Sequence, residues 1–569
     1  MAGLAQAGLL VVLLAAAWKP LGDWMARVYT DERHWRIERV LYRICRVDAA
    51  TGQRWTTYAA GVLGFSFVSI VLLYVMQRLQ FLLPLGFGRG TDGADTVSPA
   101  MAFNTAVSFV TNTNWQSYVP EQVLGHTVQM AGLTVQNVLS AAVGMAVAIA
   151  LVRGFVATGS SNGSASSTGT GDAAEGRIGN FWVDLTRGVV RILLPIAAVA
   201  AVVLVATGVV QSLRSGFDVV GVDGARSTLP LAPAASQEAV KELGTNGGGI
   251  FNANSAHPFE NPTPLSNLLE IFLLLVIPVA LTRTFGVMVG RVRQGVVLLS
   301  VMSGLWVLFL ALTWFAELHP NGPAPLAAGG ALEGKEVRFG IPGSSLFAVS
   351  TTGTSTGAVN AAHDSLTGAG GGVALINMLL GEVAPGGVGS GLYGILVLAI
   401  IAVFLAGLMV GRTPEYLGKK LGRREITCAA VSILVMPAFV LLGAGCAIVL
   451  PGTADALGND GAHGFSEVLY AWASAANNNG SAFAGLTVTG DFFQAGLGVA
   501  MLFGRFVPIL AVLALAGSLA AQRRVPAGAG TLPTDGVLFA GLVGGTVVLV
   551  SALTFFPAMA LGPIAEALS

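Results

Sequence analysis

Apolar residues occur in long blocks along the chain, and shorter polar segments separate the blocks. A helix needs about 20 such residues to cross the hydrocarbon core of a membrane. The pattern therefore predicts ten membrane-spanning helices. They lie around Gly3 to Trp18 and near residues 57–84, 127–152, 188–210, 265–286, 295–317, 391–411, 427–450, 491–522 and 535–557. No basic stretch precedes the first block, so we expect a retained helix and not a cleaved signal peptide.

Four connections between these blocks share one order of residues. Each has a short amphipathic stretch, then a polar tract rich in Gly, Thr, Asn and Ser, and then the next apolar block. The four read MAFNTAVSFV before Thr111 to Gln116, QEAVKEL before Gly244 to Gly249, SSLFAV before Ser350 to Thr354, and EVLYAWASAA before Asn477 to Gly480. Recurrence at intervals of about 105 to 135 residues indicates one structural unit that is copied four times around an axis.

The predicted fold class is all-α and integral to the membrane. A short helix followed by non-helical backbone is tolerated at membrane depth only where protein or water surrounds it. We therefore expect four repeats of span, pore helix, filter strand and span around a pseudo-fourfold pore, with one additional helix at each end. The expected divisions are residues 1–56 for the N-terminal helix and its basic loop, 57–153, 154–290, 291–425 and 426–524 for the repeats, and 525–569 for the C-terminal helix.

The composition supports this class and argues against several others. The chain is 54% hydrophobic and 11% charged, whereas soluble proteins carry roughly a quarter charged residues. Because 30 basic and 30 acidic residues give no net charge, no binding to nucleic acid is expected. The three cysteines have no metal-binding spacing, and the six histidines do not cluster. The sequence also lacks a P-loop and the Asp-Lys-Thr motif of P-type pumps, so we expect no ATP site and no bound cofactor in this chain.

The basic residues are distributed unevenly between the two sides of the predicted bundle. Of the 30 Lys and Arg, seven fall on one side, Arg505 lies inside an apolar block, and 22 fall in the connections 19–54, 153–191, 283–293, 412–424 and 523–524. The positive-inside rule places the connections with 22 basic residues in the cytoplasm. Both termini and the four polar tracts are then outside. The Ser-, Gly- and Ala-rich segments 157–175 and 525–531 are expected to be flexible cytoplasmic linkers.

The residue types in the four tracts favour the binding of a monovalent cation. A dehydrated alkali ion needs a ring of oxygens in place of its water shell, and inward-facing backbone carbonyls can supply one. Glycine tolerates the backbone conformations that this arrangement demands, and small Thr, Asn and Ser side chains can brace it through hydrogen bonds. No tract contains a carboxylate, which favours a large monovalent ion such as potassium over a divalent ion.

Several motifs resemble one known family, the KdpA family, over essentially the whole chain. The motifs are TNTNWQSY, GTNGGGIFNANSAHPFENPTP, STTGTSTGAVNAAHDSLTG, NNNGSAFAG and GRTPEYLGKK. The resemblance implies that the chain is the potassium-binding and translocating subunit of a bacterial ATP-driven potassium import complex. It also implies that the chain is a multi-pass protein of the bacterial cell (inner) membrane. It also implies a fold like that of the Trk/Ktr/HKT potassium transporters.

The resemblance also implies partners and an ion path. The expected partners are a KdpB-like P-type ATPase subunit, which would use ATP and Mg²⁺, a single-span KdpC-like subunit and a small KdpF-like subunit, together with membrane lipid. Members of this family are thought to pass ions sideways into the ATPase subunit. Two alternatives stay open at this point. A stand-alone Trk/Ktr-like channel or symporter shares the four-repeat design. An intramembrane enzyme or redox subunit would need a paired His set or a carboxylate dyad in the spans, and the sequence shows neither.

The resemblance assigns the candidate filter residues motif by motif. In this sequence they are Asn112, Thr113, Asn114 and Gln116 for the first strand, Thr245, Asn246 and Gly247 for the second, Thr351, Thr352 and Gly353 for the third, and Asn478, Asn479 and Gly480 for the fourth. Relatives often carry Cys in the third strand, at a place that Thr352 is expected to occupy here. We expect selectivity to be retained, because the backbone carbonyl is unchanged.

Two arginines and one glycine-rich stretch are candidates for control of ion exit. Arg505 lies in the middle of VAMLFGRFVPILAVL, where a charge costs about 2.5–3.5 kcal/mol or more. Gly504 and Pro508 beside it predict a broken helix that lines a water-filled path. Arg412 ends another apolar block and either snorkels to the interface or acts with Arg505 as a barrier to cations. The stretch from Gly368 to Gly391 is either a gating loop beneath the filter or a flexible connector.

Overall fold

The structure, a computed structural model, contains ten helices that are long and apolar enough to cross a membrane among the residues it describes. It describes residues 2–84, 97–158, 176–214, 216–320, 323–526, 528 and 531–568. Residues 159–175 of the first predicted linker and residues 527, 529 and 530 of the second lie outside these residues. The spans are Gly3–Thr30, Trp55–Arg78, Val128–Val156, Phe181–Ala206, Pro264–Met288, Val292–Leu318, Ser390–Val410, Arg423–Val449, Asp491–Ala521 and Val537–Leu561. The prediction of ten spans and an all-α membrane fold is confirmed.

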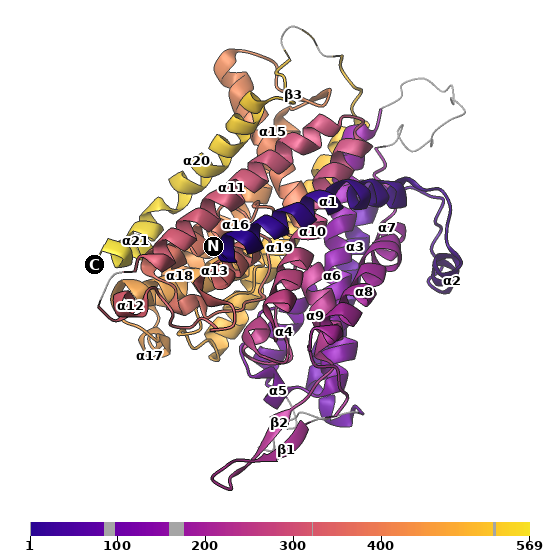
Figure 1. The fold of residues 1–569 in the computed structure, drawn as a ribbon. Helices are drawn as coiled ribbons and strands as arrows, with labels where there is room; N and C mark the ends of the chain where they lie inside the picture. Colours follow the sequence, from indigo (N-terminus) through magenta and orange to yellow (C-terminus); the bar gives the residue numbers. More distant parts are fainter. Residues whose placement is uncertain are drawn as a thin grey trace.

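The spans correspond to the long helices of Figure 1. They are α1 (Ala2–Thr30), α3 (Trp55–Arg78), α6 (Val135–Val156), α7 and α8 (Phe181–Arg187 and Leu194–Ala206), α10 (Pro264–Met288), α11 (Val292–Leu318), α15 (Ser390–Val410), α16 (Arg423–Val449), α19 (Asp491–Ala521) and α20 (Val537–Leu561). A π-helical turn over Val128–Thr134 precedes α6, and another over Gly188–Leu193 joins α7 to α8.

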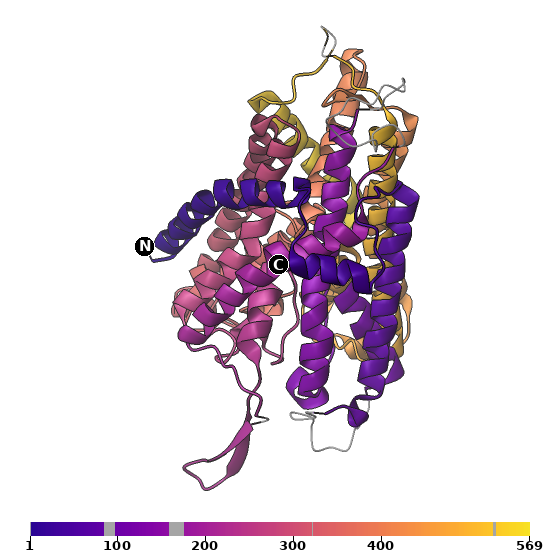
Figure 2. The ribbon, with the colours of Figure 1, turned by 90° about the vertical axis from the view of Figure 1, so that its right-hand side faces the viewer.

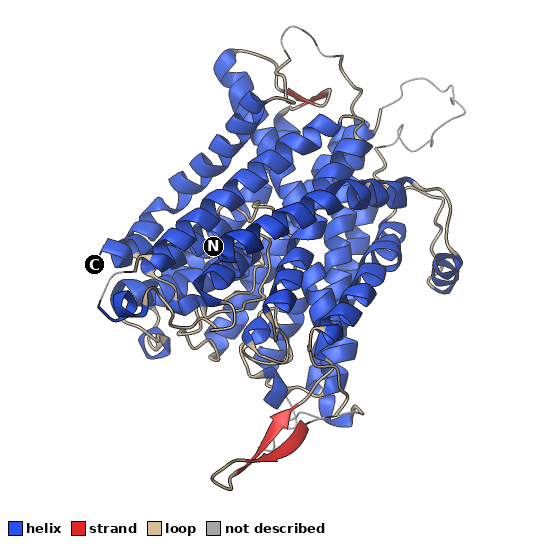
Figure 3. Ribbon diagram, in the orientation of Figure 1, coloured by secondary structure: helices blue, strands red, loops and turns tan. Residues whose placement is uncertain are grey.

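Short helices and two small hairpins fill the connections. The short helices are α2 (Arg36–Ile44), α4 (Pro99–Val110), α5 (Pro120–Val123), α9 (Ala234–Leu243), α12 (Pro323–Ala328), α13 (Gly340–Thr352), α14 (Gly368–Leu379), α17 (Thr453–Ala456), α18 (Gly461–Asn477) and α21 (Pro563–Leu568), with 3₁₀ turns at Gln80–Leu82, Asn254–Ala256 and His363–Ser365. Strands β1 (Gly216–Val220) and β2 (Arg226–Pro230) pair antiparallel, as do β3 (Glu415–Tyr416) and β4 (Lys419–Lys420). Figure 3 shows the two hairpins at opposite ends of the bundle.

The inner and outer helices differ in burial. The apolar windows of the spans that contain α6 and α10 are mostly buried inside the protein, whereas those of α1, α16 and α20 are mostly exposed. Helix α1 packs on α10, and α20 packs on α11 and α15. Figures 1 and 2 show α1 and α20 at the outside of the bundle. These two are the helices that the sequence predicts as additional to the four repeats.

Charged residues near the ends of the spans are paired, which limits the free energy lost when they are buried. Arg153 of α6 binds Asp184 of α7 at 2.6 Å, and Tyr58 of α3 donates a hydrogen bond to the same carboxylate at 3.0 Å. Arg283 of α10 binds Asp23 of α1 at 2.7 Å. The second pair holds α1 in helical form up to Thr30, twelve residues beyond the predicted end of the apolar block.

Candidate functional site

Four short helices lead to the four polar tracts and end inside the protein. They are α4, α9, α13 and α18, and most of their residues are buried. Helix α4 begins at a favourable cap, because Met101 N donates to Ser98 Oγ at 3.3 Å and Pro99 occupies the first turn. Unpaired carbonyls at the carboxyl end of a helix carry partial negative charge. The four ends therefore favour a cation in the space that they surround.

Each short helix ends in the same hydrogen-bonded turn. In a Schellman turn, an amide donates to the carbonyl five residues earlier, and the residue just before that amide has a left-handed backbone conformation. The four amide–carbonyl pairs are Thr113 to Ser108 at 2.8 Å, Asn246 to Lys241 at 2.9 Å, Thr356 to Thr351 at 3.2 Å, and Asn479 to Ser474 at 2.8 Å. The four left-handed residues are Asn112, Thr245, Ser355 and Asn478. This shared turn aligns the four tracts residue by residue.

Side chains hold these left-handed residues, each of which is unfavourable by roughly 1–2 kcal/mol for a residue other than glycine. Asn112 Nδ2 donates to the carbonyl of Thr245 at 2.7 Å, so the first two tracts are linked. Asn478 Nδ2 donates to Thr113 Oγ1 at 2.9 Å and links the fourth tract to the first. Ser355 Oγ donates to the carboxylate of Glu382. The strain is thus offset by contacts between tracts and with the loop beneath them.

The alignment corrects the prediction for the third strand. Thr351 and Thr352 lie in the last turn of α13, and Gly353 follows as its cap. The hydroxyl of Thr351 donates to the Thr356 carbonyl at 2.7 Å, and that of Thr352 donates to the Ala348 carbonyl at 2.7 Å, so both residues brace the turn from within the helix. The residues in the aligned positions are Ser355, Thr356 and Gly357. The tract STTGTSTG contains two similar tetrapeptides, STTG at 350–353 and TSTG at 354–357. The second of them holds the aligned residues.

Backbone contacts between the tracts close a ring. A Cβ atom on Gly247 would lie 2.4 Å from the Cα of Gly357, and one on Gly357 would lie 2.9 Å from the carbonyl carbon of Gly480. One on Gly480 would lie 1.8 Å from the carbonyl oxygen of Thr113, and one on Gly248 would lie 3.0 Å from that of Asn114. Real Cβ atoms do not make the closest of these contacts, so the ring exists only because glycine has no side chain. Backbone of all four tracts therefore meets around one axis.

Polar side chains fix the outer surface of this ring to the surrounding helices. Asn246 Nδ2 donates to the Asn137 carbonyl at 2.8 Å, and Asn114 Nδ2 donates to Asn137 Oδ1 at 3.0 Å. Asn479 Nδ2 donates to the Thr351 carbonyl at 3.2 Å. These hydrogen bonds engage the amide side chains of the tracts with neighbouring segments and leave them braced against the surrounding protein.

Gln116 lies beside the ring. Its Oε1 accepts from Gly249 N at 2.9 Å, and its Nε2 donates to Tyr118 Oη at 3.1 Å. It lines a cavity of about 380 Å³ together with Asn114, Gly248, Gly357 and Gly480. This cavity joins the ring to the side of the protein that carries the β1–β2 hairpin.

A buried charged cluster supports the second tract from behind. Lys241 is fully buried, and its Nζ donates to Glu238 Oε1 at 2.7 Å and to Asn254 Oδ1 at 2.8 Å, with Glu242 Oε1 at 3.5 Å. Glu260 Oε1 accepts from the amides of Ile250 and Phe251, and burial raises the pKa of its carboxyl to about 8. The cluster thereby fixes α9 to the segment that follows Gly249.

The substitution Lys241→Met is expected to destabilise the protein, because it removes the cation that compensates these buried carboxylates. Breaking such a pair costs about 3–5 kcal/mol. Thermal unfolding of the purified protein should start at a clearly lower temperature, and the double variant Lys241→Met/Glu238→Gln should recover part of the loss. Lys420→Met, at an exposed lysine, is the matched control. An unchanged unfolding temperature in Lys241→Met would show that the cluster does not support the tract.

A second charged cluster joins α18, α21 and the loop after the third tract. His463 Nδ1 lies 2.8 Å from Glu566 Oε1, and its Nε2 lies 3.3 Å from Asp364 Oδ1. Hydrogen bonds to Asp364 and Glu566 raise the pKa of the His463 imidazole to about 10. The protonated imidazole between two carboxylates links α18, α21 and the loop through two ion pairs.

The stretch predicted as a gating loop or connector is helical in its first half, which forms α14. The second half, residues 380–389, passes directly beneath the ring. Gly386 N donates to the Gly353 carbonyl at 2.7 Å, and Val388 N donates to Thr245 Oγ1 at 2.9 Å. Glu382 Oε1 accepts from Asn479 Nδ2 at 2.8 Å. The loop thus contacts the second, third and fourth tracts.

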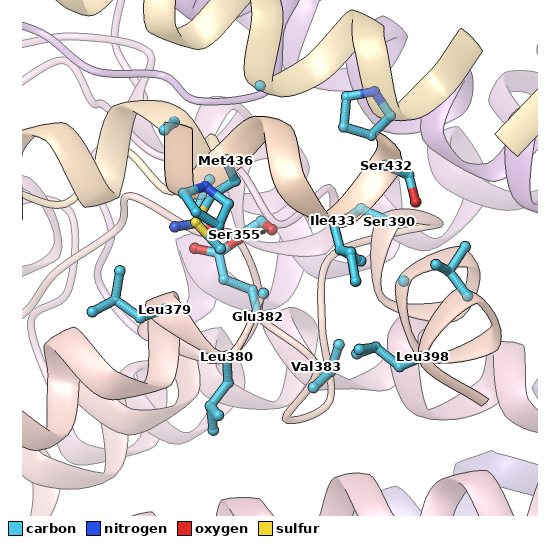
Figure 4. A pocket seen from close by; sticks show the side chains of 18 of the residues that line it. Ser355, Leu379, Leu380, Glu382, Val383, Ser390, Leu398, Ser432, Ile433 and Met436 are labelled. Atoms are coloured by element: carbon cyan, nitrogen blue, oxygen red, sulfur yellow. Dashed lines mark hydrogen bonds between the residues drawn. The ribbon is translucent and has the colours of Figure 1, made fainter. Parts of the chain in front are cut away.

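Arg505 lies beside this loop in a second cavity. The cavity, of about 130 Å³, runs from Ser355 and Asn478 past Glu382 and Arg505 to the outer helices α16 and α20. Figure 4 shows Ser355 and Glu382 close together at one end of this cavity, with Ser432 and Ile433 of α16 along it. Arg505 is buried, and among the described residues it makes no hydrogen bond or ion pair. Its charge therefore faces the cavity.

The expected break in the helix around Arg505 is absent. Helix α19 runs without interruption from Asp491 to Ala521 and includes Pro508. Gly504 has a different role, because a Cβ atom there would lie 2.1 Å from the carbonyl oxygen of Ala476, so α19 can approach the end of α18. Arg412 is exposed after the end of α15 and does not line either cavity. The structure therefore brings Arg505, but not Arg412, to the ring.

Comparison with known proteins decides the family. The family model described as KdpA, Potassium-transporting ATPase A subunit, matches residues 8–568. The chain belongs to this family. A Nocardia farcinica protein named potassium-transporting ATPase potassium-binding subunit is 64% identical over 99% of this chain and 98% of its own length. A Streptomyces coelicolor protein of the same name is 58% identical over 100% and 99%.

A potassium transporter with low sequence identity to this KdpA-family chain has a similar fold. The crystal structure of the potassium transporter TrkH from Vibrio parahaemolyticus superposes with a TM-score of 0.51, at 15% identity, over 90% of this chain and 96% of TrkH. At this identity the likeness concerns the fold alone. It agrees with the four-repeat architecture that the tracts and their shared turn describe.

Proposed function

We propose that this KdpA-family chain is the potassium-binding and translocating subunit of an ATP-driven, high-affinity potassium import complex. The observation that carries the proposal is the ring in which the backbone of four tracts meets at Gly247, Gly357 and Gly480. Such a ring offers carbonyl oxygens to a dehydrated cation. The tracts themselves carry no carboxylate, which suits a weakly hydrated monovalent ion. The names of the relatives from Nocardia and Streptomyces support potassium as that ion.

The proposed ion-binding groups follow from the aligned turns. They are the backbone carbonyls of Asn112 to Asn114, Thr245 to Gly247, Ser355 to Gly357 and Asn478 to Gly480, with Gln116 at the mouth. Thr351, Thr352 and Gly353 support the third strand from the pore helix. Potassium is the transported substrate, and this chain needs no other bound cofactor.

The proposed path of the ion turns sideways below the ring. Potassium enters through the cavity beside Gln116, binds in the ring, and leaves past the loop of residues 380–389 into the cavity that reaches α16 and α20. Arg505 lines this same cavity, so its guanidinium repels a cation that enters from the ring and acts as a barrier to passive flow along this path. Arg412, the other candidate barrier, lies at the edge of the bundle, so we assign it a minor part.

The energy for uptake comes from another chain in this proposal. A KdpB-like P-type ATPase subunit, which uses ATP and Mg²⁺, receives the ion, and KdpC-like and KdpF-like subunits complete the complex. The complex lies in the bacterial cell (inner) membrane, with both termini of this chain outside, as the distribution of basic residues predicts. The four tracts then open to the exterior.

The proposal is tested in a bacterium that lacks potassium uptake. Growth at micromolar potassium is expected when the chain is expressed with its partner subunits, and no growth is expected with the chain alone. A partner ATPase without its phosphorylated aspartate is the control for ATP dependence. Growth with the chain alone would instead support a stand-alone channel or symporter.

A second test concerns the outer mouth. Gln116→Arg places a fixed cation beside the ring, and a like charge within about 5 Å is unfavourable by roughly 3 kcal/mol at an effective dielectric constant of 20. The potassium concentration for half-maximal uptake should therefore rise by about 100-fold. Gln122→Arg, at an exposed glutamine on the same side, is the matched control. Equal potassium concentrations for half-maximal uptake in the two variants would show that Gln116 does not lie on the ion path.

A further inference from the structure

Helix α2, between the first two spans, presents three different faces. Successive residues of a helix are separated by about 100° around its axis, so Glu38 and Tyr42 share one face, and both are buried. A second face is apolar and exposed, and a third is basic and exposed. The apolar residues are Ile37, Val40, Leu41 and Ile44, and the basic residues are Arg36, Arg39 and Arg43.

The buried face fixes α2 at the height where the polar end of a span gives way to its apolar part. Glu38 binds Arg191 through two hydrogen bonds, Nε to Oε1 at 2.5 Å and Nη2 to Oε2 at 2.7 Å. Arg191 is the last charged residue before the uninterrupted apolar run of residues 192–206. Because α2 is tied to this arginine, it lies beside the charged first part of the Phe181–Ala206 span, next to the point where the apolar run begins.

The direction of α2 agrees with this position. Figure 1 views α2 nearly along its axis at the outer edge of the bundle, beyond α7, and Figure 2 views it from the side. It therefore runs across α3 and α6, as a helix in the plane of a membrane does. Its apolar side chains are open, with Ile44 72%, Ile37 54% and Val40 52% exposed. Such a face at this height suits acyl chains.

The basic face has the complementary chemistry for lipid headgroups. Among the described residues, the side chains of Arg36, Arg39 and Arg43 make no hydrogen bond or ion pair, and Arg33 and Arg46 flank them at the two ends of the helix. Guanidinium groups bind phosphate through paired hydrogen bonds. A row of arginines beside an apolar face is typical of helices that bind anionic membrane surfaces.

We propose that α2 is an interfacial helix that inserts its apolar face among acyl chains and binds the phosphates of anionic phospholipids through Arg36, Arg39 and Arg43. In the orientation proposed above, these lipids belong to the cytoplasmic leaflet. A protein surface is less suited to this helix, because three unpaired arginines adjoin an apolar strip at the membrane boundary. The role of α2 is independent of the ion path and of potassium.

The test measures which lipid surrounds α2. Cys45, exposed at the end of the helix, is labelled with an environment-sensitive fluorophore in a Cys428→Ser/Cys446→Ser chain. The full chain is reconstituted into vesicles of phosphatidylcholine and phosphatidylglycerol, of which one or the other carries brominated, quenching acyl chains. At equal mole fractions, quenching by phosphatidylglycerol should exceed that by phosphatidylcholine about twofold to fivefold, and the difference should shrink at high salt.

Variants assign the preference to the three arginines. Arg36→Gln/Arg39→Gln/Arg43→Gln should make quenching by the two lipids equal. Arg293→Gln/Arg423→Gln/Arg424→Gln, which removes three exposed arginines on the same side of the bundle, should retain the preference. Equal quenching by both lipids in the unaltered chain at low salt would overturn the proposal. So would an absence of quenching by either lipid, which would place water or protein over α2.

Discussion

Gly247→Asp is expected to abolish high-affinity potassium uptake. Any side chain at residue 247 would place its Cβ atom 2.4 Å from the Cα of Gly357 and 2.6 Å from its carbonyl carbon. Both partners are backbone, so the second and third tracts must separate, and the carboxylate adds a charge to a ring built from neutral oxygens. The potassium concentration for half-maximal uptake should rise at least about 100-fold, which corresponds to about 2.7 kcal/mol of lost binding free energy.

Two further variants separate the causes of this loss. Gly247→Ala makes the same backbone contact without the charge, so it should lose most of the affinity as well. Gly490→Asp is the matched control, because Gly490 is the exposed cap residue before α19 and a Cβ atom there would meet no atom within 4 Å. Rubidium uptake by whole cells over a range of potassium and sodium concentrations measures the effect. If Gly247→Asp preserves both the affinity for potassium and the selectivity for potassium over sodium, the ring is not the potassium-binding site.

Arg505→Ala is expected to allow potassium to leak without ATP. Arg505 lines the cavity below the ring, is buried, and makes no hydrogen bond or ion pair among the described residues, so its charge, which also acts on the nearby Glu382, acts on any cation that leaves the ring. At about 7 Å and an effective dielectric constant of 20, the repulsion is roughly 2 kcal/mol. Its removal should raise passive rubidium flux about tenfold or more in vesicles that contain the complex without ATP.

Comparison variants test whether charge at this position is responsible. Arg505→Lys keeps a cationic side chain in the cavity, so its passive rubidium flux without ATP should stay as low as that of the unaltered complex. Arg412→Ala removes an exposed arginine outside both cavities, and its passive flux should match that of the unaltered complex. If ATP hydrolysis and transport remain fully coupled in Arg505→Ala, the barrier lies elsewhere, and the loop of residues 380–389 becomes the leading candidate.

The sequence predicts the membrane architecture well because hydrocarbon imposes a simple rule on it. Apolar blocks of sufficient length must cross the membrane, and among the described residues all ten predicted blocks form helices long and apolar enough to do so. The rule is less informative at the ends of spans. Helix α1 continues through polar residues to Thr30 because Asp23 pairs with Arg283 of α10. A partner that is 260 residues away in the chain leaves no mark on local hydropathy.

The ring is predicted less completely, because its register depends on hydrogen bonds and not on composition. Ser350 to Gly357 contains two candidate turns of similar sequence, and only the bond from Thr356 N to the Thr351 carbonyl selects the second. Alignment of the four tracts from their final glycines Gly247 and Gly480 would have indicated Gly357. Gly504 and Pro508 suggested a break in α19, but packing against α18 maintains a continuous helix.

Two other parts of the site carry weaker signals in the sequence. Glu382 lies in a glycine-rich stretch that also fits a connector, and only the fold places it next to Ser355 and Asn479. The charged residues of QEAVKEL are unusual for a buried helix, and this contrast could have indicated the cluster around Lys241. Asn254 and Ser255, which accept hydrogen bonds from Lys241, lie in the 3₁₀ turn that follows the second tract. Tertiary contacts decide this pairing.

The most direct test of the account is to locate the bound ion. Crystals of the complex grown in rubidium, which substitutes for potassium and scatters anomalously, should show a peak on the axis between the backbones of Thr113, Gly247, Gly357 and Gly480. Excess potassium should remove this peak, and excess sodium should leave it in place. An empty ring, with rubidium at the Glu238 and Glu242 carboxylates instead, or a peak that sodium removes equally well, would contradict a potassium-selective filter in this chain.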